Sequence, residues 1–474
     1  MLGLFGTLGL STRSLQVQQQ GIEVAGHNLA NVNNPAYARQ RVAITAATSI
    51  GTEHGFIEGT GAEVANIQQI RNSILDAQVV NENSVTGSLE AQQQALQYAQ
   101  SNLGQQIDRG AASAEGAAAT PGLGQHAIGD AINDLFKSFQ SVSTQPSSIA
   151  ERDLLLKNAQ TLAERFNATD KRLGELSDSL NTAVDSDVSS ANDLIKDIAN
   201  LNQQIIKAEA GSEGTANDLR DARQGKLEEL GKLVNFDMAP GESGAVNITI
   251  GGTLMVDTTV VRDQLETYDS GNGKLLVRAA STDAPLSITG GHIAGTIDAR
   301  DGAIQTLRND LSTLASTIIN QVNTIHQSGY GLDDSTGLNL FGGTNASDMR
   351  LNAAVTPEKV AASDKPGEDG NNKVIVQLAD LQKTPQAGLN NQTFTQRYSA
   401  IVGDLGASLN KTNQGIADQT VVTNMVQAQR DSVSAVSMDE EMTDLVKFQR
   451  AYQASAQVVN VINEMLDTVI NMMR

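Results

Sequence analysis

An apolar seam at each end of the chain constrains the fold more than any other feature. Apolar or small side chains recur there at alternating steps of four and three residues, which places them on one face of a long helix that packs against another helix. The C-terminal seam consists of Phe448, Tyr452, Ser455, Val459, Ile462, Leu466, Val469 and Met473, and the N-terminal seam of Leu4, Leu8, Ser11, Leu15, Gln18, Ile22, Ala25, Leu29 and Val32. Each seam is too narrow to form a domain core, so we expect the two ends to pair with each other.

The side chains around these seams favour assembly of many copies. A heptad stripe usually reflects ordinary helix packing, but at the extreme termini little sequence remains to cover the other helix faces. Neutral amides flank the seams at Gln16, Gln18, Gln19, Gln20, Asn460 and Asn463. Because charges are costly to desolvate, helices with few charges can pack side by side in a tube wall. We expect the assembly seam to comprise Leu15, Ile22, Leu29, Phe448, Tyr452, Val459, Ile462, Leu466 and Val469.

The middle of the chain predicts long helices with one change of texture. Helical spacing covers residues 63–106, 303–327 and 398–426, and it is longest over residues 149–210. At about 1.5 Å per residue the longest stretch would span about 90 Å, either as one rod or as a helix broken once. Residues 236–293 instead alternate apolar and polar side chains between glycine turns, which is typical of β-strands.

These patterns predict a mainly α fold in which both chain ends build each helical layer and one small β-rich domain is inserted. We expect residues 1–45 and 433–474 to form a terminal helical layer, the inner layer of a tube. Residues 46–235 and 294–432 would form a central helical layer. Residues 236–293 would form the β-rich domain on the outside.

A search for catalytic or ligand-binding chemistry finds little. The chain has 54 Asp and Glu against 33 Lys and Arg, a net charge of -21, which disfavours a basic surface for nucleic acid or anionic lipid. It has no Cys, no phosphate-binding loop, no nucleophile elbow, and no two of its five His at metal-binding spacing on a helix. The acidic run Asp439-Glu440-Glu441 is explained by the dipole of a helix that begins there. We therefore expect no enzyme, no cofactor and no metal site.

The sequence also bears on localisation. No apolar run approaches the roughly 20 residues of a membrane span. The first ten residues are apolar but have no basic region before them, so they do not form a cleaved export signal. We expect a cytoplasmic protein, or one exported by a route that needs no cleaved signal.

The stretch NLANVNNPAY at residues 28–37 resembles the N-terminal signature of bacterial flagellar rod, hook and hook-associated proteins. The following ARQRV at residues 38–42 narrows the resemblance to the hook-associated protein 1 family. Thr and Gly are usual in that family at the positions of Asn34 and Ala36. The residues that carry the family motif here are Asn28, Asn31, Pro35, Tyr37, Arg39 and Gln40.

Three further stretches are similar to the same family, in the same order along the chain. They are GTGAEV at residues 59–64 with Ile67, Ile70 and Arg71; NDLRDAR at residues 217–223 with Leu227 and Leu230; and DEEM at residues 439–442 with FQRAYQA at residues 448–454. The resemblance thus covers nearly the whole chain.

The resemblance implies a structural protein that forms a junction ring between the flagellar hook and the filament. Its partners would be further copies of itself, the hook protein, the neighbouring hook-associated protein on the filament side, and an export chaperone that holds the C-terminal helix. No nucleic acid or membrane partner is implied. Export would run through the flagellar type III apparatus, which places the protein outside the cell in the flagellum.

Two kinds of alternative remain at this point. Within the same class, the chain could be a flagellin-like filament subunit or another hook-associated protein, although residues 34–40 argue against flagellin. From a different class, it could be a secreted helical adhesin, or an enzyme whose site lies in the middle region.

Overall fold

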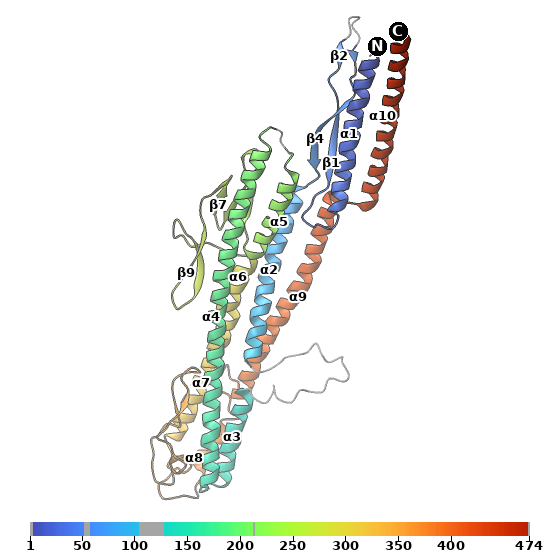
Figure 1. Cartoon of the computed structure of the whole chain (residues 1–474). Helices are drawn as coiled ribbons and strands as arrows, with labels where there is room; N and C mark the ends of the chain where they lie inside the picture. Colours follow the sequence, from blue (N-terminus) through green and yellow to red (C-terminus); the bar gives the residue numbers. More distant parts are fainter. Residues whose placement is uncertain (1–2, 52–56, 104–127, 212–213, 473–474) are drawn as a thin grey trace, which may run out of the picture.

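The chain folds into an elongated helical rod with its two ends at the same tip (Figure 1). The computed structural model describes residues 3–51, 57–103, 128–211 and 214–472. Within them, no helix is both long enough and apolar enough to cross a membrane. The mainly α architecture with long helices at both ends and a small β-containing middle region confirms the fold class expected from the sequence.

The tip of the rod is built by both ends of the chain. Helix α1 (Leu4–Ala30) lies along α10 (Met438–Met472), and the strands β1 (Gln40–Ala46) and β4 (Ala62–Gln69) form an antiparallel ribbon beside α1 (Figure 1). Two short strands, β2 (Ile50–Gly51) and β3 (Ile57–Glu58), extend this ribbon. The expected pairing of the chain ends is therefore present within one copy.

The expectation of one helix over residues 63–106 is wrong at its start. Strand β4 occupies residues 62–69, and α2 runs only from Ser73 to Asn102. The side chain of Asn72 caps α2 by accepting hydrogen bonds from the backbone N–H groups of Ile74 and Leu75. Residues 62–69, which precede this cap, are a strand and not helix because they pair with β1, an earlier segment of the chain.

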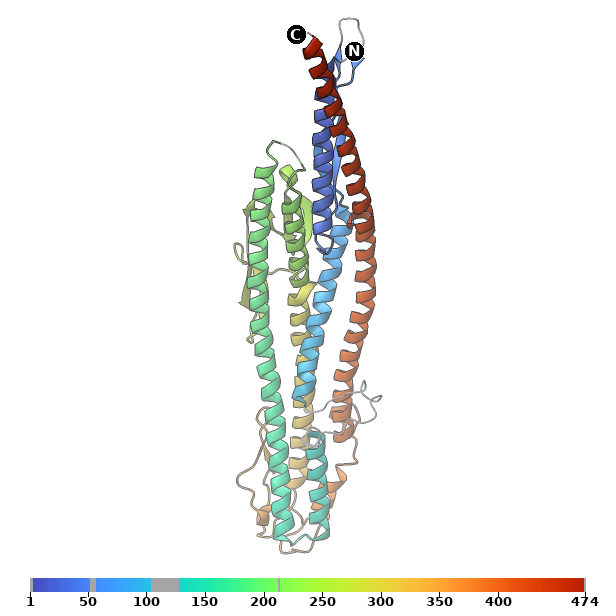
Figure 2. The same cartoon turned by 45° about the vertical axis from the view of Figure 1, so that its right-hand side comes forward.

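The body of the rod is a bundle of long helices. Residues 149–210 were expected to form either one rod or a helix broken once. They form α4 (Ile149–Ala208), one uninterrupted helix of 60 residues. Besides α2 and α4, the helical body contains α3 (Ile128–Thr144), α5 (Asn217–Leu233), α6 (Gly291–Asp298), a π-helical turn (Ala299–Ile304), α7 (Gln305–His326), α8 (Lys373–Asp380) and α9 (Phe394–Ser434). Helix α9 rises along the body and leads into α10 after a short break (Figure 2).

The half of the body that lies farther from the α1–α10 tip has its own hydrophobic core. Helices α3, α7 and α9 pack there on the first half of α4, and Phe136 stacks on Phe394 with ring centroids 5.7 Å apart. The remaining small elements are β11 (Phe341–Gly342), β12 (Arg350–Leu351) and the 3-10 turns Glu242–Gly244, Pro357–Lys359 and Ala387–Leu389.

The β-rich segment packs against the second half of α4. It contains a four-stranded antiparallel sheet of β5 (Asp237–Pro240), β6 (Val246–Ile250), β7 (Thr253–Asp257) and β8 (Val260–Val261), and a hairpin of β9 (Leu265–Asp269) and β10 (Leu275–Ala279). Ile248, Ile250 and Val256 are fully buried in one core with Val184 and Ile195 of α4. Period-2 patterning therefore located the strands, while Gly291 already begins α6.

Candidate functional site

The contact between α1 and α10 depends on small residues. Gly21 lies against the ring of Phe448, and the hydroxyl groups of Ser14 and Ser455 are 2.9 Å apart. Small side chains allow two helix backbones to approach closely, so the pair is tightly packed along this line. The buried side of α1 is formed by Ser11, Val17, Gly21, Val24, Ala25 and Asn28.

Two members of the expected N-terminal seam, Ser11 and Ala25, lie on this buried side, but the three that were expected to carry assembly lie beside it. Leu15, Ile22 and Leu29 are only half-buried. The cause is the β1–β4 ribbon, which packs on α1 from another direction and shifts its buried side away from the line of these three residues.

The expected seam of α10 is only partly covered within one copy. Ile462 is buried, with 4% of its surface exposed, while Tyr452 and Val469 are 38% and 44% exposed. Phe448, Val459 and Leu466 are half-buried. One neighbouring helix therefore covers only part of the apolar surface of α10.

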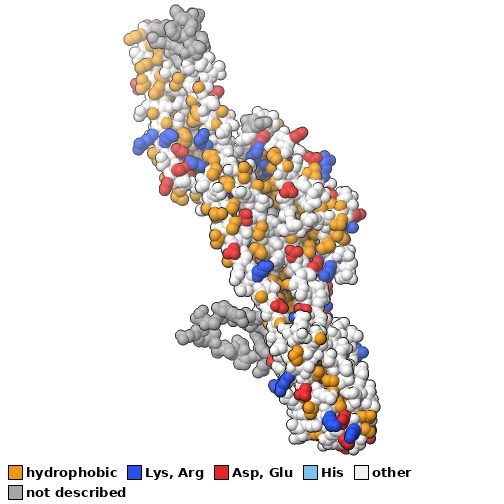
Figure 3. Space-filling model, turned by 180° about the vertical axis from the view of Figure 1, so that it is seen from behind, with side chains coloured by type: hydrophobic (Ala, Val, Ile, Leu, Met, Phe, Trp, Pro, Cys, Tyr) orange, Lys and Arg blue, Asp and Glu red, His pale blue; other side chains and the backbone are white. Residues whose placement is uncertain are grey.

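Exposed large apolar side chains recur along α9 and α10. Large apolar side chains that are at least a third exposed on α9 and α10 are Val421, Val422, Met425, Val433, Met438, Met442, Val446, Tyr452, Val458, Val461, Met465, Val469, Ile470 and Met472. Figure 3 shows hydrophobic side chains at intervals along the terminal arm and down the body. Exposed apolar patches of this extent are typical of protein interaction surfaces.

Asn28 holds the base of the helix pair together. Its side-chain amide donates to the backbone oxygen of Gln40 and to Glu441 Oε2, both at 2.9 Å. Its Oδ1 accepts from Tyr37 Oη at 2.7 Å and from the backbone N–H of Gln40 at 3.0 Å. Asn28 is 1% exposed, so all four hydrogen bonds are made away from water. They join α1, β1, α10 and the turn at residues 31–37, called the motif turn below.

Arg39 ties the same region to the start of α10. Its guanidinium lies 2.5 Å from Glu440, 2.7 Å from Glu441 and 3.7 Å from Asp444. Burial alone would lower the pKa of Arg39, but Glu441 and Glu440 outweigh it and raise that pKa. The backbone N–H of Arg39 also donates to Ser434 at the end of α9. Glu440 and Glu441 of the acidic run thus bind Arg39 as well as complementing the helix dipole.

Asp221 of α5 joins the motif turn and ribbon to the body of the rod. Its Oδ1 accepts from the backbone N–H of Ala38 at 3.2 Å, from Gln69 Nε2 at 2.6 Å and from Arg71 Nη2 at 2.5 Å. Its Oδ2 is buried without a hydrogen-bond partner. Arg71 is shared with Asp76 at 3.0 Å. Burial raises the pKa of Asp221 to about 6, even though Arg71 acts to lower it.

Arg430 of α9 makes a second link between α5 and the turn that carries Pro35. Its Nη1 lies 2.7 Å from Glu228 Oε1 of α5, and its Nη2 donates to the backbone oxygen of Pro35 at 3.1 Å. Pro35 is exposed, and Asn31 is half-buried with its amide donating to the backbone oxygen of His27 in the last turn of α1. Of the motif residues, Asn28, Tyr37, Arg39 and Gln40 thus meet at the joint between tip and body, whereas Pro35 and Asn31 shape the turn.

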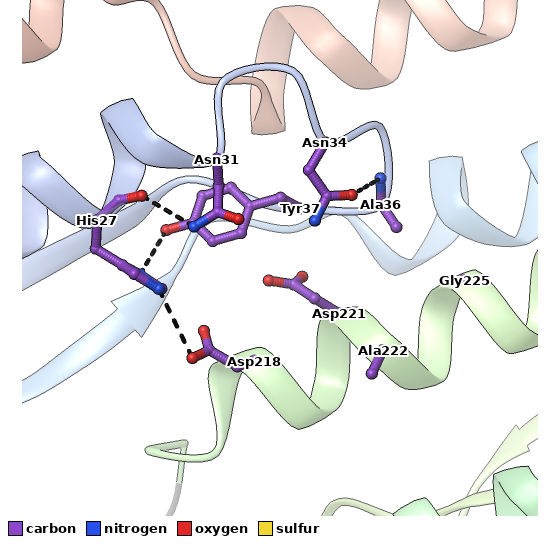
Figure 4. Close-up of a pocket in the computed structure, with 9 residues that line it drawn as sticks. All are labelled: His27, Asn31, Asn34, Ala36, Tyr37, Asp218, Asp221, Ala222 and Gly225. Atoms are coloured by element: carbon purple, nitrogen blue, oxygen red, sulfur yellow. Dashed lines mark hydrogen bonds and ion pairs between the residues drawn. The ribbon is translucent and has the colours of Figure 1, made fainter.

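A polar pocket of about 380 Å³ opens beside this joint (Figure 4). Because Tyr37 gives its only hydroxyl proton to Asn28, His27 Nδ1 must donate to the Tyr37 oxygen, 3.1 Å away. The other ring nitrogen of His27 lies 3.8 Å from Asp218 Oδ2. The pocket is lined by His27, Asn31, Asn34, Ala36, Tyr37, Asp218, Asp221, Ala222 and Gly225.

Sequence reasoning did not single out several residues of this joint. Gly21, Asp221 and Arg430 carry contacts that no spacing rule indicated. Asp221 and Arg71 lie inside the stretches that resemble the flagellar family, so that resemblance was the available signal for them.

Two family models match the chain. The model for the flagellar hook-associated protein FlgK helical domain matches residues 121–341, and that for the flagellar basal body rod FlgEFG protein C-terminal matches residues 427–472. Flagellar hook-associated protein 1 of Bacillus subtilis (strain 168) is 25% identical over 99% of this chain and 99% of its own length. That of Salmonella typhimurium (strain LT2) is 22% identical over 96% of this chain and 98% of its own length.

The fold has a solved counterpart. The flagellar hook junction protein FlgK from Burkholderia pseudomallei superposes with a TM-score of 0.64 at 14% identity, covering 76% of this chain and 100% of that one. A helical rod with paired ends, matched by a rod-protein model at its C-terminus, defines a structural protein of the bacterial flagellum. Within that class, the chain belongs to the family of flagellar hook-associated protein 1.

Proposed function

We propose that this protein is a structural subunit of the hook–filament junction, assembled as a ring through its terminal helices. The observation that carries this proposal is the apolar side of α10, which α1 covers only in part. Each large apolar side chain buried by a neighbouring copy would contribute about 1.5–3 kcal/mol, and a ring repeats that gain at every interface.

The arrangement of layers follows from the same surface. The terminal layer, residues 1–45 with 433–474, would line the tube, with the central layer of residues 46–235 and 294–432 outside it. The β-rich domain of residues 236–293 would form modest outer decoration. The β1–β4 ribbon crosses the first boundary, because β4 packs with the tip although it follows residue 45.

The partners would lie at both ends of the ring. We propose the hook protein on one side and the next hook-associated protein on the filament side. Before assembly, an export chaperone would cover α10, because a helix with so many exposed apolar side chains needs protection from aggregation. The protein would leave through the flagellar type III apparatus and reside in the extracellular flagellum.

Electron microscopy of a deletion strain tests the junction role. We expect cells without the gene to keep their hooks, to lack filaments and to shed flagellin monomers into the medium. Complementation with the intact gene should restore filaments. Intact filaments on the deletion strain would contradict the proposal.

A further inference from the structure

The polar pocket at the joint carries more negative charge than its own residues neutralise. The Asp218 side chain is 70% exposed, while Asp221 is 5% exposed and has an unpartnered oxygen. Among the described residues, Arg71 is the only arginine that binds Asp221, and Asp76 shares it. After burial itself, Asp221, Asp218 and Glu441 raise the pKa of the Tyr37 hydroxyl, which shows that the site disfavours further negative charge.

The pocket is shaped to receive a cationic group from outside. Figure 4 shows the carboxyl groups of Asp218 and Asp221 pointing from α5 towards the turn that carries Asn31 and Tyr37. Asp218 accepts a hydrogen bond from Gln40 through Oδ1, and its Oδ2 faces His27 at 3.8 Å. A guanidinium at the rim of the pocket would find an exposed carboxylate to bind and a negative environment behind it.

A suitable cation lies at the same level on the opposite side of the β1–β4 ribbon. Side chains alternate between the two sides of a strand. Gln40 is buried and bonds Asp218, Arg41 is exposed, and Val42 is buried again. Arg41 therefore points away from α5. It has no ion pair among the residues that the structure describes.

We propose that Arg41 of one copy binds Asp218 at the pocket of the next copy. This inference rests on the proposed function, because it requires copies to stand side by side. An acidic pocket and an arginine on opposite sides of one ribbon at one height make a head-to-tail contact, and head-to-tail contacts generate rings when the rotation closes. The pair would fix the lateral register of the ring, while the apolar side of α10 supplies most of the binding energy.

Charge exchange in the full-length chain tests the contact. We expect Arg41→Glu to reduce the number of filament-bearing cells at least about tenfold, because like charges would then face each other. Asp218→Arg should do the same, and the double variant should restore filaments because the pair is reversed. Asp218→Asn is the matched control for local folding, since its amide oxygen can still accept from Gln40. Secreted protein and thermal unfolding are measured for each variant.

Cross-linking tests the geometry directly, because the chain has no Cys of its own. Cells that express Arg41→Cys and Asp218→Cys copies together should yield a product of twice the chain mass when isolated flagella are treated with a short bismaleimide. Arg41→Cys with Asp269→Cys, a residue of the outer hairpin, is the matched pair and should not cross-link.

Three results would overturn the inference. The first is a double variant as defective as Arg41→Glu, although it is exported and folded like wild type. The second is a normal filament count for Arg41→Glu while the deletion strain lacks filaments, which leaves the junction role standing and removes only this contact. The third is a pocket filled by a free divalent cation. In that case Mg²⁺ or Ca²⁺ would raise the unfolding temperature of wild type but not of Asp218→Asn, and Arg41→Glu would assemble normally.

Discussion

The ring of Phe448 lies directly against Gly21, where an added Cβ would come within 2.6 Å of the ring. The glycine therefore sets how closely α1 and α10 approach. A larger residue would have to push the helices apart, and overpacking of this kind typically costs about 1–3 kcal/mol.

We predict that Gly21→Val loosens the helix pair. Amide exchange in α1 and in the first half of α10 should become faster, while exchange in the body should not change. Gly26→Ala is the matched control, because a Cβ there meets no atom within 4 Å and Ala is the better helix former. If the amides of α1 exchange equally slowly in Gly21→Val and wild type, the contact between Gly21 and Phe448 does not control the stability of the helix pair.

A second prediction concerns Asn28. Replacing it by Ala leaves the Tyr37 hydroxyl and the Gln40 backbone groups without their buried partners, and each such group costs about 1–3 kcal/mol. We expect Asn28→Ala to uncouple tip from body, seen as faster exchange over residues 37–42 and 438–444. Asn31→Ala, which loses only a side-chain hydrogen bond to the last turn of α1, should behave nearly like wild type. Similar exchange rates in the two variants would refute a special role for Asn28.

A third prediction places assembly on the α10 seam. Leu466→Asp, or Ile462→Asp, should abolish filament attachment while the body stays folded. An unpaired carboxylate buried between copies at Leu466, or within the helix pair at Ile462, would cost several kcal/mol in place of the gain from a buried apolar side chain. Leu154→Asp makes the same change at an exposed leucine of α4 and should leave filaments intact.

The export step must be separated from assembly in that experiment. Secreted protein is therefore assayed alongside filament number, because a chaperone on α10 could read the same side chains. If Leu466→Asp protein is exported at normal levels and the cells carry normal filaments, the α10 seam is not needed for filament attachment.

A fourth prediction follows from the raised pKa of Asp221, about 6 in the folded chain against 3.8 for an ordinary aspartate. Between these two values the folded state binds a proton that the unfolded state does not. The contribution of Asp221 to stability therefore falls as pH rises through this window. Relative to Asp221→Asn, wild type should lose on the order of 2 kcal/mol of unfolding free energy between pH 4 and 7. Urea unfolding of both proteins across this range measures it, and a constant difference would contradict the raised pKa.

The sequence by itself determined most of the long helices and the small β segment, but not the β1–β4 ribbon. Heptad spacing located α4 and α9, and period-2 alternation located β6 and β7, because both patterns are local properties of a chain with one buried side. The resemblance over residues 28–42 brought in the family, and it contained Tyr37 and Arg39 of the joint.

Only the tertiary structure decided which side of α1 is buried and what meets at the joint. Leu15 and Ile22 are only half-buried because α10 and the β1–β4 ribbon pack on other sides of α1. Arg71 and Asp221 are separated by 150 residues in sequence yet lie 2.5 Å apart. Periodicity reports that a helix has an apolar side, but the partner of that side, and the pairing of distant charges, depend on how the whole chain packs.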